Sequence, residues 1–158
     1  MKRIFSIIAV LTIVSSHAGI AQNSINDNQL SKLLSGYYSI KDALVSGNAS
    51  TSATNAAAFA KIANSIDYKI ISEGNITALV QDAAAIATAK DLKKQREVFA
   101  NLSNNMAAVA KAVKLSVQPI YQQYCPMKKA SWLSSEKTIR NPYFGSAMLS
   151  CGELANTY

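Results

Sequence analysis

The sequence predicts a mainly α protein, an antiparallel four-helix bundle followed by a small irregular C-terminal lobe that contains both cysteines. Apolar residues between positions 30 and 113 recur at steps of three, four and seven, the period of amphipathic helices. Short breaks rich in Gly, Asn and Asp separate these stretches, as expected for antiparallel neighbours. After Pro119 the periodicity stops. Residues 22–118 are therefore assigned to the bundle and residues 119–158 to the lobe, as parts of one domain.

Residues 1–21 are predicted to be a secretory signal peptide. Two basic residues precede an apolar run over residues 4–14, and small residues follow, with cleavage expected after Ala18 or Ala21. The run is shorter than the roughly 20 residues that span a bilayer, which disfavours the alternative of an N-terminal membrane anchor. We expect an exported, most simply periplasmic, protein of a Gram-negative bacterium, with no stable membrane insertion after cleavage.

Removal of this segment excludes several classes of function. It takes away the only histidine, His17, and lowers the net charge from +7 to +5 because Lys2 and Arg3 leave. Without histidine, a Ser-His-Asp triad, a Cys-His pair and a Cys/His zinc site are all absent. The carboxylates are scattered, no Gly-rich phosphate loop occurs, and the lysines form no dense block. We therefore expect neither an enzyme nor a nucleic-acid-binding protein.

Three segments precede the last helix. The first is expected to be capped by residues 26–28 and to end at Gly47, a usual C-terminal signal. Its apolar face includes Leu33, Tyr37, Ile40 and Leu44. The second is expected over residues 51–72 and closes at residues 73–75, where the third begins.

The fourth segment has the clearest pattern. It begins at Asp91, a good N-cap residue. Residues at seven-residue spacing form its apolar stripe: Leu92, Phe99, Met106 and Val113, with Leu102 and Val109. Met106 is therefore expected in the core and not at a metal. Residues 89–91 leave open whether the third and fourth segments are separate helices, and Pro119 is expected to end the helix near Gln118.

Two pairs of sulfur-containing residues lie in the lobe. They are Cys125 with Met127, and Met148 with Cys151. Residues two apart in an extended chain, or three apart in a helix, point to one side, so each pair can direct two sulfur atoms toward one point. Two thiolates and two thioethers form a soft ligand set, which selects monovalent copper. These four residues are the candidate metal ligands, and Trp132 and Tyr124 are candidates for shielding the site.

The same residues support a second interpretation. An exported chain with two cysteines is typical of a disulfide, here Cys125–Cys151, which would staple a structural or protein-interaction domain with no metal role. A combination is also open. The cysteines would be bridged when oxidised and bind metal when reduced, because the thiolate is the ligand.

The segment from Pro119 to Leu154 resembles the signature of a family of exported domains of unknown function that is common in Bacteroidetes. The matching elements are Tyr124-Cys125-Pro126-Met127, Trp132-Leu133-Ser134, Asn141-Pro142-Tyr143-Phe144-Gly145, and Met148-Leu149 with Cys151-Gly152. Residues 37–48 also resemble the first helix of that family. Members stand alone or are attached to periplasmic adaptor subunits of copper and other heavy-metal efflux pumps. The resemblance implies heavy-metal handling, with copper as the leading candidate for the metal and an efflux adaptor or another exported protein as a candidate partner.

Overall fold

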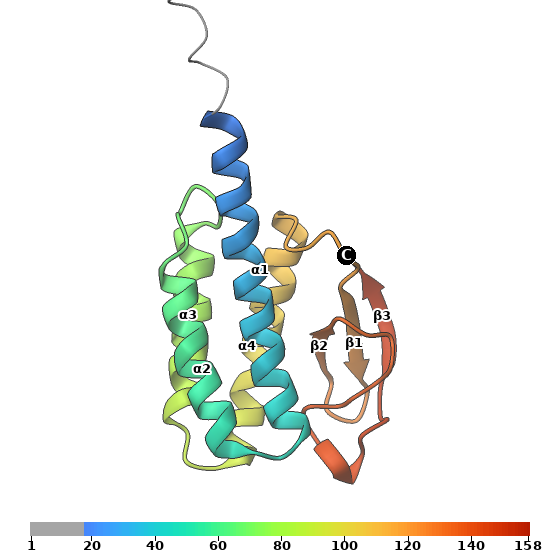
Figure 1. The fold of residues 1–158 in the computed structure, drawn as a ribbon. Helices are drawn as coiled ribbons and strands as arrows, with labels where there is room; N and C mark the ends of the chain where they lie inside the picture. Colours follow the sequence, from blue (N-terminus) through green and yellow to red (C-terminus); the bar gives the residue numbers. More distant parts are fainter. Residues whose placement is uncertain (1–17) are drawn as a thin grey trace, which may run out of the picture.

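Four antiparallel helices form the body of the protein (Figure 1). The computed structural model describes residues 18–158, so most of the predicted signal peptide, with His17, lies outside the described residues. The helices are α1 (Ala18–Val45), α2 (Ala49–Asn64), α3 (Glu73–Thr88) and α4 (Leu92–Ala112). The predicted mainly α bundle is confirmed. Within residues 18–158, no helix is both long and apolar enough to cross a membrane.

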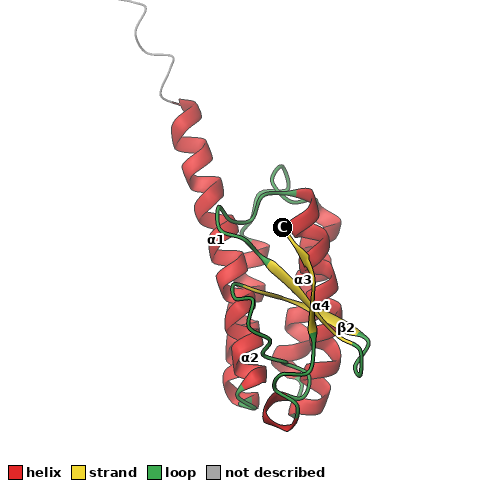
Figure 2. Cartoon of the chain, turned by 90° about the vertical axis from the view of Figure 1, so that its right-hand side faces the viewer, coloured by secondary structure: helices red, strands yellow, loops and turns green. Residues whose placement is uncertain are grey.

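The C-terminal lobe is built around a three-stranded antiparallel sheet. Its strands are β1 (Tyr121–Cys125), β2 (Ala130–Ser134) and β3 (Glu153–Thr157), in the order β2-β1-β3, and a single 3-10 turn, η1 (Gly145–Ala147), precedes β3. The sheet lies against the side of the bundle, and β2 contacts α4 (Figure 2). The outer strand β3 is exposed along its whole length.

The structure corrects the predicted start of the first helix and the end of the second. α1 already includes residues 26–28, where a cap was expected, because no Gly or Pro interrupts residues 20–35. It ends as predicted before Gly47, whose φ of 74° is in the left-handed region. α2 ends at Asn64 and not near residue 72. There, the backbone N–H and the hydroxyl of Ser65 both donate to the carbonyl of Ile62, which closes the helix.

The boundary between α3 and α4 is also settled. Ala89 has extended geometry, so the two helices are separate. The Asp91 carboxylate accepts the N–H of Lys94 at 2.8 Å, which confirms the predicted cap. α4 ends at Ala112, earlier than the expected end near Gln118, and the chain then buries Leu115 and Ile120 in the main core cluster. Burial of these side chains explains the early exit from the helix.

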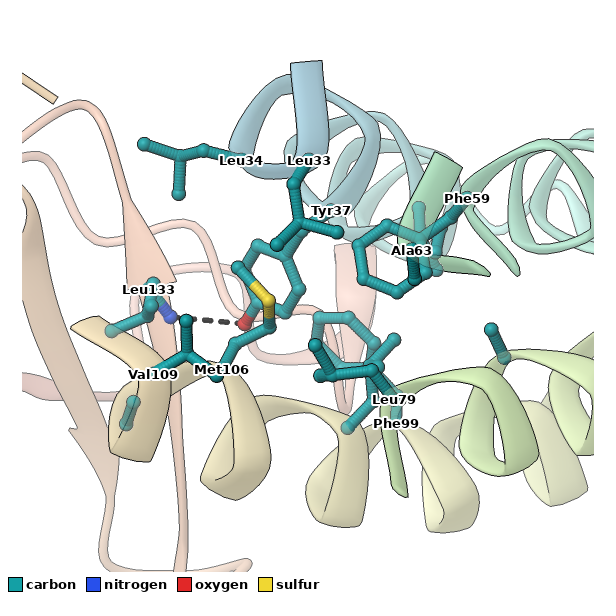
Figure 3. Packing of buried hydrophobic residues seen from close by; sticks show 14 of the residues in the cluster. Leu33, Leu34, Tyr37, Phe59, Ala63, Leu79, Phe99, Met106, Val109 and Leu133 are labelled. Carbon is teal, nitrogen blue, oxygen red and sulfur yellow. Dashed lines mark hydrogen bonds between the residues drawn. The ribbon is translucent and has the colours of Figure 1, made fainter. Parts of the chain in front are cut away.

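Tyr37 connects the bundle to the lobe. Its ring is fully buried and stacks on Phe99 of α4, with centroids 5.3 Å apart. The N–H of Leu133 in β2 donates to the Tyr37 hydroxyl at 3.0 Å (Figure 3). The hydroxyl proton is therefore available for Ser103 of α4, whose Oγ lies 2.7 Å away. Met106 is buried in the same cluster, which confirms its predicted core position. One hydroxyl thus joins α1, α4 and β2.

Candidate functional site

The fold brings the two cysteines into contact. Cys125 is the last residue of β1, and Cys151 lies two residues before β3. Their Sγ atoms are 3.4 Å apart, and both are free thiols. Cys125 is fully buried, whereas Cys151 is partly exposed. A disulfide bond is about 2.05 Å long, so the pair is in contact without being bonded.

The turn after β1 surrounds the sulfur of Cys125 with hydrogen-bond donors. β1 and β2 pair at Cys125 and Ala130, and the turn between them contains Lys129 in the left-handed region, with φ of 54°. Burial alone would raise the pKa of the Cys125 thiol. The backbone N–H of Lys128, the thiol of Cys151, the amide of Asn141 and the backbone N–H of Met127 outweigh burial and lower this pKa. The site therefore favours one thiolate.

The pKa of the second thiol moves in the opposite direction. The hydrogen bond with Cys125 is the largest cause that raises the pKa of Cys151, and desolvation and the negative charge of Cys125 add to it. The backbone N–H of Met127 opposes this rise. When the pair loses its first proton, the charge is therefore expected on the buried sulfur of Cys125 and the remaining proton on Cys151.

Gly152 allows the segment with Cys151 to approach the sheet. A Cβ atom at this position would lie 2.8 Å from Cη2 of Trp132 and 3.1 Å from the carbonyl oxygen of Tyr124. A larger residue would therefore force either the Trp132 ring or the segment with Cys151 to shift. The predicted shielding residues thus both lie beside the residue that follows Cys151. Trp132 is almost fully buried and meets the ring of Tyr143 edge-on, with centroids 5.9 Å apart.

Asn141 holds the Cys151 segment in place. Its side chain is fully buried, and its Nδ2 donates to the carbonyl of Cys151 at 2.7 Å. Its Oδ1 accepts the N–H of Tyr143 at 2.8 Å and that of Phe144 at 3.3 Å. Asn141 was absent from the predicted site residues. The signal for it was the Asn-Pro turn motif, in which the Asn side chain bonds backbone two residues on.

The local geometry expected for the two methionines is wrong. Cys125 and Met127 are not in one extended stretch, because the strand ends at Cys125 and Met127 lies in the turn, with its side chain 68% exposed. Met148 and Cys151 are not on one helical face, because η1 ends at Ala147 and Met148 follows with φ of −149°. The Met148 carbonyl accepts the N–H of Cys151 at 3.1 Å. Both methionines thus lie in turns that border the cysteine pair.

The residues that show the family of the protein lie in the helical bundle. Residues 33–118, more than half of the chain, match the model of a family described as a protein of unknown function (DUF3347). The chain belongs to this family. No curated protein and no solved structure matches it. The match ends before β1, so the DUF3347 assignment covers the bundle and neither cysteine.

The donor set of this DUF3347 protein limits which ions the site fits. In the part of the chain that the structure describes, no three His, Cys, Asp or Glu side chains gather where they could hold a metal ion. Among these residue types, the cysteine pair therefore offers an ion two sulfur ligands, Cys125 and Cys151. Sulfur-only ligation suits a soft ion and not zinc with histidine or calcium with oxygen ligands.

Proposed function

We propose that this DUF3347 protein binds a soft metal ion, monovalent copper first among them, through the thiolates of Cys125 and Cys151. Met127 and Met148 complete the site as thioether ligands from the two adjoining turns. The protein is exported to the periplasm and is not an enzyme. Its task is to sequester the ion or to deliver it.

One observation carries this proposal. Two residues 26 positions apart in sequence place their sulfur atoms 3.4 Å from each other. Backbone N–H groups of Lys128 and Met127 surround one of these sulfurs and favour its charged form. A thiolate is the form that binds metal, and a soft donor pair favours a soft ion.

The partner is proposed from the resemblance. Residues 119–154 resemble exported domains, common in Bacteroidetes, that accompany periplasmic adaptor subunits of copper and heavy-metal efflux pumps. We propose that the ion passes to or from such an adaptor. The ring of Trp132 lies beside Gly152, next to Cys151, and would limit access of water to a bound ion, whereas Tyr124 approaches Gly152 through its backbone carbonyl.

The test is an anaerobic titration of the reduced protein with monovalent copper against a chromogenic competitor. We expect one ion per chain, and replacement of both cysteines by serine should abolish competition. Replacement of a methionine ligand by leucine should weaken affinity by about tenfold or more, because loss of a supporting interaction at a metal has effects of that size. Met106→Leu is the matched control, since Met106 is buried in the helical core and should leave affinity unchanged.

The outcomes separate the parts of the proposal. Unchanged affinity in the double cysteine variant would refute the site altogether. Unchanged affinity in Met127→Leu and Met148→Leu, with loss in the cysteine variant, would reduce the site to a two-cysteine site. Transfer of copper to an efflux adaptor requires a separate competition experiment with that adaptor as acceptor.

A structural disulfide is the second candidate, and the same 3.4 Å contact favours it. A bridge between residues 26 positions apart would stabilise the fold by about 3.5 kcal/mol on the chain-entropy model. The discriminating measurement is a free-thiol count on mature protein purified anaerobically without reductant. A complete disulfide that survives mild reductant would favour a staple over a metal site.

A further inference from the structure

The two sulfur atoms of the pair differ in their access to solvent. Cys125 ends β1 beneath the adjoining segments and has no exposed surface. Cys151 lies in the connection between η1 and β3 and is partly exposed. A reagent that approaches from solvent therefore reaches the sulfur of Cys151 first. Access to the thiol is one of the factors that set the rate of thiol–disulfide exchange.

We propose that Cys151 is a site of reversible mixed-disulfide modification by small disulfides, and that Cys125 is the thiol that resolves the adduct. In the first step, Cys151 passes its proton to the sulfur of Cys125 in contact with it, and the resulting Cys151 thiolate attacks one sulfur of an external disulfide, R–S–S–R. The external S–S bond breaks, a Cys151–S–R bond forms, and one RS⁻ leaves. In the second step, Cys125 gives its proton to the released RS⁻, its thiolate attacks Sγ of Cys151, and the second RS⁻ leaves.

The electrons and atoms of this sequence balance. The two protein thiols lose two electrons and two protons, and the external disulfide becomes two thiols. The products are a Cys125–Cys151 disulfide and two molecules of RSH. The oxidant is the small disulfide itself, of the class to which oxidised glutathione belongs.

The contact geometry fits the second step. The Sγ atoms are already 3.4 Å apart, so attack by Cys125 requires little motion. Exchange proceeds best when attacking, central and leaving sulfurs are nearly in line. Cys125 lies on the buried side of Cys151, and the group R enters from solvent. The leaving sulfur is therefore expected on the side of Cys151 that faces solvent, away from the buried Cys125.

Hydrogen bonds keep the modified residue within reach of Cys125. The carbonyl of Cys151 accepts the Asn141 amide at 2.7 Å, and its N–H donates to the Met148 carbonyl at 3.1 Å. Both bonds involve the backbone of Cys151, so an adduct on its side chain leaves them intact. A mixed disulfide at Cys151 should therefore be short-lived whenever Cys125 is present.

Once the Cys125–Cys151 disulfide has formed, the lobe has no free thiolate. If the proposed metal binding holds, the disulfide form cannot take up the ion, and reduction restores the site. This gating rests on the proposed function. The exchange reaction does not, and its test is performed without metal.

The experiment uses reduced, metal-free protein in the presence of a chelator, with oxidised glutathione as the probe and intact-mass spectrometry as the readout. Cys125→Ser should accumulate one stable glutathionyl adduct on Cys151. Cys151→Ser should react at least about tenfold more slowly, because its remaining thiol is buried. The unmodified sequence should pass through a transient adduct and end as the internal disulfide. In denaturant, the two single variants should react at similar rates, which controls for intrinsic thiol reactivity.

Two results would overturn the proposal. Equal or faster adduct formation in folded Cys151→Ser would show that Cys125 is the attacked position. A stable adduct on the unmodified sequence would show that Cys125 does not resolve it. Either result leaves the copper titration unaffected, and failure to bind copper leaves this order of attack unaffected.

Discussion

Replacement of Asn141 by Ala should weaken both the fold and the cysteine site. The Asn141 side chain accepts the N–H of Tyr143 and donates to the carbonyl of Cys151, and it is fully buried. Alanine removes these hydrogen bonds, so the N–H of Tyr143 loses its acceptor and the carbonyl of Cys151 loses its donor. No other residue of the lobe bonds both the turn before η1 and the segment with Cys151.

The expected loss of unfolding free energy follows from the two shorter hydrogen bonds of the Asn141 side chain. An unsatisfied buried polar group costs about 1–3 kcal/mol. Tyr143 is buried, so loss of the bond to its N–H should cost about 2 kcal/mol. Cys151 is partly exposed, so water can replace the amide at its carbonyl, and this loss should cost about 1 kcal/mol. The sum of about 3 kcal/mol should lower Tm by about 6–12 °C for a chain of this size.

The assay is urea unfolding with both cysteines kept reduced, so that no disulfide contributes. Asn104→Ala is the control, because Asn104 is exposed on α4 and its change should stay within about 0.5 kcal/mol. Asn141→Asp gives a second readout. It places a carboxylate beside Cys125 and should raise the pKa of that thiol. A loss below about 0.5 kcal/mol in Asn141→Ala would refute the proposed role of this side chain.

Three other results are expected. Tyr37→Phe should lower the free energy of unfolding in urea by about 2 kcal/mol, because the buried N–H of Leu133 loses its acceptor; an unchanged midpoint would contradict this. Gly145→Ala should cost about 2 kcal/mol in thermal unfolding, because φ is 56° and the new Cβ would lie 2.9 Å from a carbonyl oxygen of α1. Ultraviolet thiolate absorbance of the reduced protein should rise in two steps, below and above the usual thiol pKa, and Cys151→Ser should remove the upper step. The lowered pKa of Cys125 means that its thiolate stabilises the fold above the usual thiol pKa, and this contribution disappears as pH falls through the lowered value. The raised pKa of Cys151 has the reverse effect, so stability should fall again at higher pH.

The sequence pattern predicted helix ends correctly where residues close in sequence form the cap. Asp91 and Gly47 cap or end their helices through contacts within a few residues, and both were predicted. The period failed between α2 and α3. Ile66 is buried there and Ile70 is partly buried, and both continue the apolar period of α2, although the backbone has already left the helix at Ser65. Periodicity reports which side chains are buried, and it does not report the backbone path between them.

The contact between the two cysteines could be predicted from the sequence, but the backbone geometry around the two methionines could not. Two cysteines in one short lobe made their proximity an expectation, and the 3.4 Å contact agrees with it. The turn at Met127 and the turn at Met148 depend on long-range bonds, such as that from Asn141 to Cys151. Local spacing carries no information about such bonds. The strand and helix geometries assumed for the two pairs were therefore wrong.

The two sulfurs are held by different parts of the molecule, and this difference bears on how an ion could leave. Cys125 ends a strand that pairs with β2, and β2 is tied to the bundle through Tyr37 and Leu133. Cys151 is held by Asn141 and by the close approach at Gly152. Movement of the Cys151 segment would separate the sulfurs while the helical core stays folded. On the proposed function, the bundle fixes one ligand and the outer segment supplies the ligand that opens, so release of the ion requires no unfolding of the family domain.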